Sequence, residues 1–208
     1  MRDRVILDAA KALFAEQGFE AVGVDQIGAG AGMTGPAIYR HFRGKDEILA
    51  TLFDEAMDRL LTLTGTRLHD PMEDLRNLAR GHAEFALTDR ELLSIYAREE
   101  RALTKDHRRR LVRRQRSYVA RWTESLAACM PTRSEAQVEA AAYALIGMLL
   151  GASHWPRGLI TADGAIDLLV DLVENAVTEP GSVAPQSAPK APAAVAKKRA
   201  PAARKRVS

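Results

Sequence analysis

The sequence predicts an all-α protein, and three observations support this prediction. Apolar residues recur every three or four positions along most of the chain, which is the spacing of one face of an α-helix. No segment alternates apolar and polar residues as a half-buried strand would. The hydrophobic content of 47% in 208 residues is ordinary for a globular protein with a sizeable core.

Residues that start or end helices mark the boundaries of the predicted elements. The expected helices span 3–17, 24–30, 36–42, 45–63, 71–87, 90–103, 105–128, 134–154 and 163–177. Asp70 can cap the helix that begins at Pro71, because a proline ring is tolerated in a first turn. Thr88-Asp89 and the segments 131–134 and 156–161 are expected to be breaks.

The second of these helices is predicted to be weak. Gly23 stands where a capping side chain is expected, and a glycine offers no side-chain acceptor. Gly28 and Gly30 each disfavour a helix by about 1 kcal/mol. We therefore expect this helix to depend on packing through Val24 and Ile27.

The following corner and helix have the features of a helix-turn-helix. Gly32 lies at the corner, Thr34 stands at the N-cap position of the next helix, and Pro36 falls in its first turn. Ile38 and Phe42 are four residues apart, so they share the face that anchors this short helix to a core. The polar side chains between them point elsewhere, as in a helix that enters a DNA major groove.

This stretch resembles the tetracycline-repressor (TetR) family of bacterial transcription regulators. The matching residues are Ile27, Ala31, Gly32, Thr34, Tyr39, His41, Phe42, Lys45 and Leu49. The resemblance implies a helix-turn-helix domain over 1–46 and a helical ligand-binding and dimerisation domain over 47–178. It also implies a homodimer that binds a palindromic operator on double-stranded DNA, usually as a repressor. The resemblance does not name a ligand, and we expect release by a small apolar or acyl-type ligand.

The predicted DNA-binding residues are Thr34, Gly35, Pro36, Ala37, Tyr39, Arg40, His41 and Lys45. The matching family positions imply phosphate contacts for Thr34, Tyr39, His41 and Lys45. Gly35 and Pro36 would allow the backbone to approach DNA closely. Ala37 and Arg40 are the candidates for contacts to base edges, because a guanidinium can bond guanine bidentately.

The larger domain is expected to hold an apolar pocket for a small-molecule effector. The candidate lining residues are His82, Phe85, Leu87, Tyr96, Trp122, Met148 and Trp155. Each of them can equally be ordinary core filling, since aromatic and methionine side chains at helical spacing often are. His82 and His154 lack neighbours at the spacing of metal ligands, so no metal is expected.

Charge is densest in residues 98–121, which contain ten basic and three acidic residues. One interpretation is a solvated helix face with intrahelical ion pairs. The alternative is that some arginines meet the DNA-reading domain or an anionic ligand, such as an acyl-coenzyme A phosphate or a carboxylate.

Two segments, 138–154 and 165–177, are apolar nearly all round. A helix of this kind is expected to be buried. Because a helix-turn-helix needs two half-sites for useful specificity, we expect these two helices to form a homodimer interface, with an ordinary core helix as the alternative.

The last thirty residues, 179–208, form a predicted disordered tail of proline, alanine and basic residues. They carry seven Lys or Arg and one acid, so the remaining residues have a net charge of −3 within the total of +3. The tail is either simply solvated or a source of sequence-independent DNA affinity. The second possibility leaves open an architectural DNA-binding protein as the alternative function.

Other classes of protein are disfavoured. No Gly-x-Ser-x-Gly, His-Glu-x-x-His or Walker motif is present, so we expect neither an enzyme nor a cofactor. The GxGxxG match from Gly30 to Gly35 follows a helix rather than a strand, which disfavours dinucleotide binding. A single cysteine, Cys129, and no signal peptide favour a cytoplasmic protein, and the uncharged run 140–156 is short for a membrane span.

Overall fold

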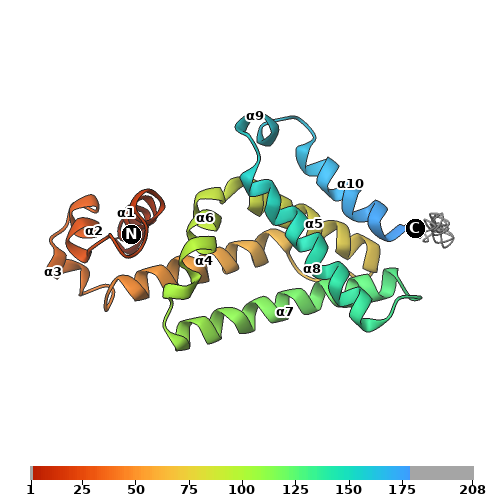
Figure 1. Ribbon diagram of the computed structural model, residues 1–208, viewed down its shortest axis with the longest axis horizontal. Coiled ribbons are helices and arrows are strands. Elements are labelled where there is room, and N and C mark those ends of the chain that lie inside the picture. Colours follow the sequence, from red (N-terminus) through yellow and green to blue (C-terminus); the bar gives the residue numbers. More distant parts are fainter. Residues whose placement is uncertain (1, 179–208) are drawn as a thin grey trace, which may run out of the picture. The chain divides into compact units, whose positions relative to one another are not determined.

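The computed structural model describes residues 2–178, and every regular element in that range is a helix (Figure 1). The α-helices are α1 (Arg2–Gln17), α2 (Val24–Gly30), α3 (Gly35–Ile38), α4 (Lys45–Thr64), α5 (Pro71–Thr88), α6 (Arg90–Glu99), α7 (Lys105–Cys129), α8 (Glu135–Gly151), α9 (Arg157–Ile160) and α10 (Ala165–Thr178). Short 3-10 helices, Glu100–Ala102 and Ala152–His154, extend α6 and α8. The prediction of an all-α fold is confirmed, whereas the predicted tail, 179–208, lies outside the described residues.

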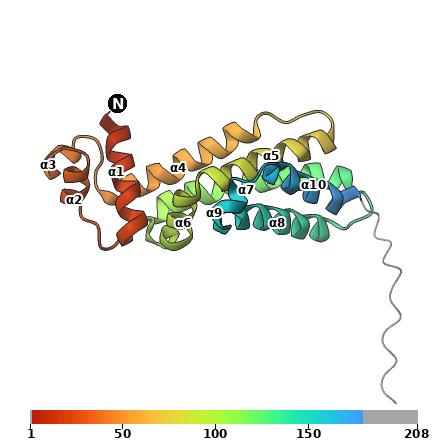
Figure 2. The ribbon, with the colours of Figure 1, turned by 90° about the horizontal axis from the view of Figure 1, so that it is seen from above.

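The N-terminal head, residues 2–42, consists of α1, α2 and α3 around a small apolar core (Figure 2). Ile6 and Phe14 of α1 are fully buried, as are Ile27 of α2 and Ile38 of α3. These four residues come from all three helices, so each helix depends on the other two for its apolar face.

Two glycines and one glutamine shape the turns of the head. Gly18 ends α1 with a φ of 82°, and Gly32 turns the chain from α2 towards α3 with a φ of 65°. Residues with a Cβ rarely adopt this left-handed conformation. The start of α2 has no side-chain cap, but Gln26 reaches back and accepts a hydrogen bond from the Gly23 N–H at 2.7 Å. This bond partly replaces the missing cap.

The helical body, residues 45–178, is built around α5. That helix contacts α4, α7, α8 and α10, and α4 runs from the head into the body beside it (Figure 1, Figure 2). Gly81 lets α5 approach α4 closely, because a Cβ built there would lie 2.5 Å from the carbonyl oxygen of Leu63. Asp70 caps α5 as predicted, with Oδ1 accepting from the Glu73 N–H at 2.8 Å.

Four predicted segments differ from the structure. The helix expected over 36–42 is one turn only, Gly35–Ile38, and the chain continues in turns until α4 begins at Lys45. Thr34 stands at the N-cap position but makes no side-chain cap bond, so little besides core packing supports this turn. A short helix, α9, lies within the break expected at 156–161. The ends of the helices predicted over 90–103 and 134–154 are 3-10 turns.

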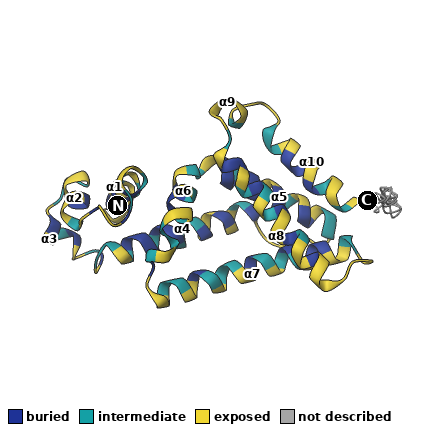
Figure 3. Ribbon diagram, viewed as in Figure 1, coloured by how far each residue is buried: buried dark blue, intermediate teal, exposed yellow. Residues whose placement is uncertain are grey.

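Within a single chain, α8 and α10 are buried on one side only (Figure 3). Tyr143 of α8 is 56% exposed, and Leu168 and Leu172 of α10 are 54% and 45% exposed. Each helix has the rest of the body on one side only, so its opposite apolar face stays open. The stretch Glu135–His154 could span a membrane by length and composition alone, but it packs against α5 and α7 as a helix of the body does.

Candidate nucleic-acid interface and effector pocket

The polar side chains around α3 face outward because the apolar ones fill the core of the head. Ile38 is fully buried and Phe42 is only 7% exposed, as their spacing predicted. Tyr39 is 60% exposed, and Arg40 is exposed as well. The side chain of Arg40 has no hydrogen bond or ion pair among residues 2–178, so this surface is free to contact another molecule.

Four more predicted DNA-binding residues differ in how open they are. Thr34 and Pro36 are exposed, and Ala37 is half-buried. Gly35 is buried, and a Cβ at this position would collide with the carboxylate of Asp25 in α2. A larger residue at this position would require the Asp25 side chain to move, a contact that the sequence did not predict.

His41 and Lys45 are held by the head itself. His41 Nδ1 lies 2.6 Å from Asp3 Oδ1. Lys45 Nζ donates to the carbonyl oxygens of Phe19 at 2.9 Å and Glu20 at 3.3 Å. The same ammonium lies 4.4 Å from the centre of the Phe19 ring, a cation–π distance. His41 ties α1 to the segment after α3, and Lys45 ties the loop after α1 to the start of α4, so a phosphate contact by either would compete with these bonds.

Helix α6 joins the body to the head. Arg98 Nη2 donates to the carbonyl oxygen of Ala15 at 3.0 Å, near the end of α1 where the helix dipole is negative. Glu99 Oε1 accepts from the Phe19 N–H at 3.2 Å. One arginine of the charged segment therefore meets the head, as one of the sequence-based alternatives stated.

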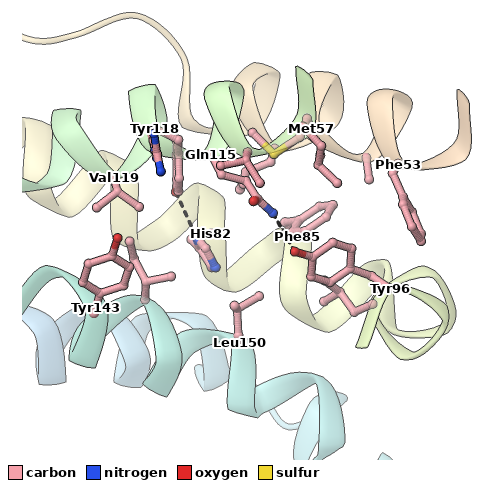
Figure 4. A pocket seen from close by; sticks show the side chains of 17 residues that line it. Phe53, Met57, His82, Phe85, Tyr96, Gln115, Tyr118, Val119, Tyr143 and Leu150 are labelled. Carbon is pink, nitrogen blue, oxygen red and sulfur yellow. Dashed lines mark hydrogen bonds between the residues drawn. The ribbon is translucent and has the colours of Figure 1, made fainter. Parts of the chain in front are cut away.

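A cavity of about 390 Å³ lies within the body between α4, α5, α6, α7 and α8 (Figure 4). Its lining residues are Phe53, Ala56, Met57, Leu60, His82, Phe85, Leu93, Tyr96, Leu111, Val112, Gln115, Arg116, Tyr118, Val119, Tyr143, Ile146 and Leu150. Three predicted lining residues, His82, Phe85 and Tyr96, belong to this set. The volume is within the range of small-molecule sites, and the wall is mostly apolar.

The other sequence candidates do not line the cavity. Trp122 and Leu87 are buried in the core, while Met148 and Trp155 are half-buried elsewhere. Periodicity identifies the apolar face of a helix, but it does not tell which apolar side chains border an empty space. Phe53 of α4 was missed for that reason, because its place in the wall depends on how α4 packs against other helices.

His82 is the buried polar group of the cavity wall. Its Nδ1 lies 2.8 Å from the Tyr118 hydroxyl, and its ring stacks on the Tyr118 ring with centroids 5.7 Å apart (Figure 4). Burial lowers the pKa of His82 from 6.5 to about 4, so the imidazole is neutral at physiological pH. Its Nε2 is buried and has no hydrogen-bond partner among residues 2–178. Burial also raises the pKa of Tyr118.

One face of α7 uses its arginines to hold neighbouring helices. Arg114 Nη1 lies 3.4 Å from Asp54 Oδ1, and Arg121 Nη2 lies 2.6 Å from Asp74 Oδ1. Burial of Asp74 raises its pKa, but hydrogen bonds from Arg121, Ser125 and the backbone outweigh this effect and leave the pKa below its ordinary value. Charged groups on this face therefore fix α7 to α4 and α5.

The other face of α7 keeps its charges open. An exposed groove there is lined by Lys105, Arg108, Arg109, Val112, Arg113 and Arg116. Only one intrahelical ion pair is found in the described part of α7, Arg109 with Asp106 at 3.7 Å. The side chains of Lys105, Arg113 and Arg116 have no ion pair or hydrogen-bond acceptor within residues 2–178. Solvation with intrahelical pairing therefore describes this helix only in part.

The motifs that suggested other chemistry have no matching surroundings. The GxGxxG match lies across α2, the corner at Gly32 and the start of α3, and no strand precedes it in the described residues. Within the same residues, no three His, Cys, Asp or Glu side chains lie together as a metal site.

The head has three helices and an exposed polar surface around α3, and it is joined to a helical body that contains an apolar cavity. This is the architecture of a helix-turn-helix regulator. Residues 6–52 match the family model for bacterial regulatory proteins of the tetR family. Residues 69–177 match the model for the tetracyclin repressor-like C-terminal domain. The chain therefore belongs to the tetracycline-repressor (TetR) family and is a transcriptional regulator rather than an enzyme.

Two relatives match this chain over short stretches. The HTH-type transcriptional activator FasR of Mycolicibacterium smegmatis is 33% identical over 57 residues, which cover 27% of this chain and 26% of FasR. The HTH-type transcriptional repressor Rv1474c of Mycobacterium tuberculosis is 39% identical over 59 residues, which cover 28% of this chain and 32% of that protein. The match thus spans about a third or less of the length of these relatives, of which one is an activator and the other a repressor.

A solved structure shares the fold over nearly its whole length. The crystal structure of AibR in complex with isovaleryl coenzyme A and operator DNA has a TM-score of 0.70 and 21% identity, covering 85% of this chain and 98% of AibR. This similarity extends the agreement in fold from the head to the body.

Proposed function

We propose that the protein is a cytoplasmic, ligand-responsive repressor that binds a palindromic operator as a homodimer. A small apolar or acyl-type ligand in the cavity would release it. The observation that carries this proposal is the position of α6, which borders the cavity through Leu93 and Tyr96 and holds the head through Arg98 and Glu99. An occupant of the cavity can therefore act on the head through one short helix.

The DNA contacts are proposed for the surface around α3. Arg40, with Ala37 beside it, would reach base edges in the major groove, while Thr34 and Tyr39 hold phosphates. The exposure and free guanidinium of Arg40 support its role. The same surface offers the backbone at Pro36, so the bound protein can lie close to DNA.

The homodimer is proposed to form through α8 and α10. Tyr143, Leu168 and Leu172 are large apolar side chains that one chain leaves open. Along α8, Gly147 and Gly151 have nothing within 4 Å of a built Cβ, so another helix could approach closely. A second copy would cover both faces and place two heads on one operator.

A dimer-breaking variant tests this part of the proposal. Leu168→Glu with Leu172→Glu would place charges on the open face of α10, where one chain needs neither side chain for its core. Sedimentation should show a folded monomer that no longer binds a palindrome. A dimer with unchanged operator affinity would contradict the proposed interface.

The ligand switch is proposed to follow from different affinities for two arrangements of the heads. A ligand that fills the cavity better when α6 has moved favours the arrangement in which the heads do not fit the operator, and its effect cannot exceed that difference in affinity. The AibR structure, which holds both isovaleryl coenzyme A and operator DNA, supports a small-molecule effector by similarity.

Footprinting of the full chain on the DNA upstream of its own gene, next to random DNA, tests the function. Protection of a palindrome, lost in Arg40→Ala, is the expected result. Uniform coating of both DNAs would instead favour the alternative, an architectural DNA-binding protein that uses the basic segment 179–208.

A further inference from the structure

Helix α7 separates its basic residues by function. Arg114 and Arg121 form ion pairs with acids of α4 and α5, and these acids neutralise the two arginine charges within the fold. Lys105, Arg113 and Arg116 lie on the groove side, where the described residues offer them no acid. A folded chain gains nothing from unpaired cations placed side by side, since they repel one another.

The basic groove and the apolar cavity lie side by side. Val112 and Arg116 line both, so the charged row adjoins the cavity. Arg116 is exposed and also lines the cavity, which shows that the cavity reaches the surface beside the basic groove. A single elongated molecule could therefore occupy an apolar space and a cationic surface at once.

We infer that the effector is an amphipathic molecule whose apolar chain lies in the cavity and whose phosphate-bearing head lies on the basic row of α7. The basic row is Lys105, Arg108, Arg109, Arg113 and Arg116. This inference refines the proposed function and rests on it only for the claim that binding regulates DNA release.

The number and type of the cations favour phosphate over a single carboxylate. Guanidinium groups bond phosphate oxygens in a fixed, bidentate geometry, and the row supplies four of them within three turns of one helix. Arg108 is already oriented, because it donates to the carbonyl oxygens of Glu100 and Arg101. One carboxylate would need one such partner and would leave the others unpaired.

The interior of the cavity adds a second requirement on the ligand. His82 Nε2 is buried, faces no protein partner in the described residues, and belongs to a neutral ring that lines the cavity. A buried polar atom without a partner is destabilising until something bonds it. Because this atom has almost no accessible surface, a carbonyl or hydroxyl group of the ligand would satisfy it only once the cavity wall shifts, and a plain hydrocarbon chain would not satisfy it.

Isothermal titration of the full chain with four probes of the same chain length tests the inference. The probes are octanoyl-coenzyme A and octanoyl lysophosphatidic acid, which carry phosphate, and octanoic acid and octanol, which do not. We expect the two phosphate probes to bind at least tenfold more tightly than octanoic acid, with an affinity that falls as salt rises. Equal affinity for octanol and the phosphate probes would overturn the inference. The ratio between the two phosphate probes distinguishes a thioester source from a lipid source.

Paired variants separate the row from general charge. Arg113→Ala with Arg116→Ala should weaken both phosphate probes at least tenfold and should weaken octanol, which carries no phosphate, much less. Arg133→Ala with Arg157→Ala is the matched control, because it also removes two exposed arginines without a side-chain partner in the described residues. Equal losses in the two double variants would overturn the inference.

Operator binding without any probe keeps this inference apart from the proposed function. If Arg113→Ala with Arg116→Ala weakens binding to DNA but not to the phosphate probes, the row contacts DNA and the inference is wrong. If the wild-type chain binds the phosphate probes through the row but protects no operator, the ligand site stands and the proposed function fails.

Discussion

The head and the body place their functional groups in opposite ways. In the head, the core is small and the candidate contact residues point outward, with Tyr39 60% exposed. In the body, the candidate site is an opening within the core, and His82 beside it is 2% exposed. A change of contact residue in the head therefore alters binding with little effect on folding. A change in the cavity wall alters packing at the same time, so effector specificity and stability are coupled in the body.

Acidification should lower the free energy of unfolding through His82, and this is the largest effect on stability that we expect. Above pH 6.5 the histidine is neutral in both the folded and unfolded states, so it makes no difference. Below pH 6.5 the unfolded chain takes up a proton first, and the free energy of unfolding falls until about pH 4, the pKa of the buried ring. The full difference corresponds to roughly 3 kcal/mol.

Urea denaturation of the wild type and of His82→Leu between pH 7.5 and 4.5 measures this contribution. The variant loses the bond to Tyr118 and is less stable at neutral pH, but its stability should fall less steeply on acidification. Parallel curves for the two proteins would show that His82 titrates normally, and the contrast between buried and exposed sites would lose its main support.

Adding one methyl group at a glycine compares the two regions directly. Gly81→Ala would force the backbones of α4 and α5 apart, because the nearest atoms are backbone atoms of Leu63 and Thr64. Overpacking of this kind should destabilise the protein by about 2 kcal/mol. In the head, the obstacle at Gly35 is the exposed side chain of Asp25, which can rotate away, so Gly35→Ala should change stability by less than about 0.5 kcal/mol. The reverse order in urea denaturation would contradict this comparison.

The head was more predictable from sequence than the body because its determinants are local. The four-residue spacing of Ile38 and Phe42 correctly gave the buried face of α3, and the exposed side chains followed from it. What the sequence missed there is long-range, such as the bond from His41 to Asp3. That contact depends on where α1 lies against α3, which no spacing within one helix reveals.

The cavity was less predictable from sequence, because its wall depends on contacts between helices that are far apart in the chain. The apolar faces of the body helices were predicted, yet the wall includes Phe53 and Met57 of α4 and excludes Trp122 and Met148. Whether an apolar side chain meets another side chain or an empty space is decided by the packing of five helices at once. The basic row on α7 could be suspected from its composition, but only the acids of α4 and α5 determine which arginines of this helix are paired across the fold.

Two substitutions in the head should separate base recognition from phosphate binding, with effects of about tenfold. Arg40→Ala is expected to lower the preference for one base pair of the operator, because a bidentate contact to a base edge is lost. Tyr39→Ala should weaken binding to all sequences alike. Competition mobility-shift assays measure both, and urea midpoints should stay at the wild-type value since both residues are exposed. If both variants lost preference equally, the assignment of roles to these two residues would be wrong.

The smallest expected effect concerns the link between the two regions. Arg98→Ala removes the bonds to the end of α1 while leaving the α6 side chains that border the cavity in place. Operator affinity without ligand should change by no more than about twofold, because the heads keep their own cores. In Arg98→Ala, the probe octanoyl-coenzyme A should release the operator less completely than in the wild type. Coupling energies between sites are typically about 1–3 kcal/mol, and this variant lacks one of the contacts that carry the coupling. Arg101→Ala, an exposed arginine three residues further along, is the matched control and should respond as the wild type does.

Equal release in all three proteins, with unchanged probe affinity, would show that the signal reaches the head through α4 instead, the other helix that contacts α1 and also lines the cavity.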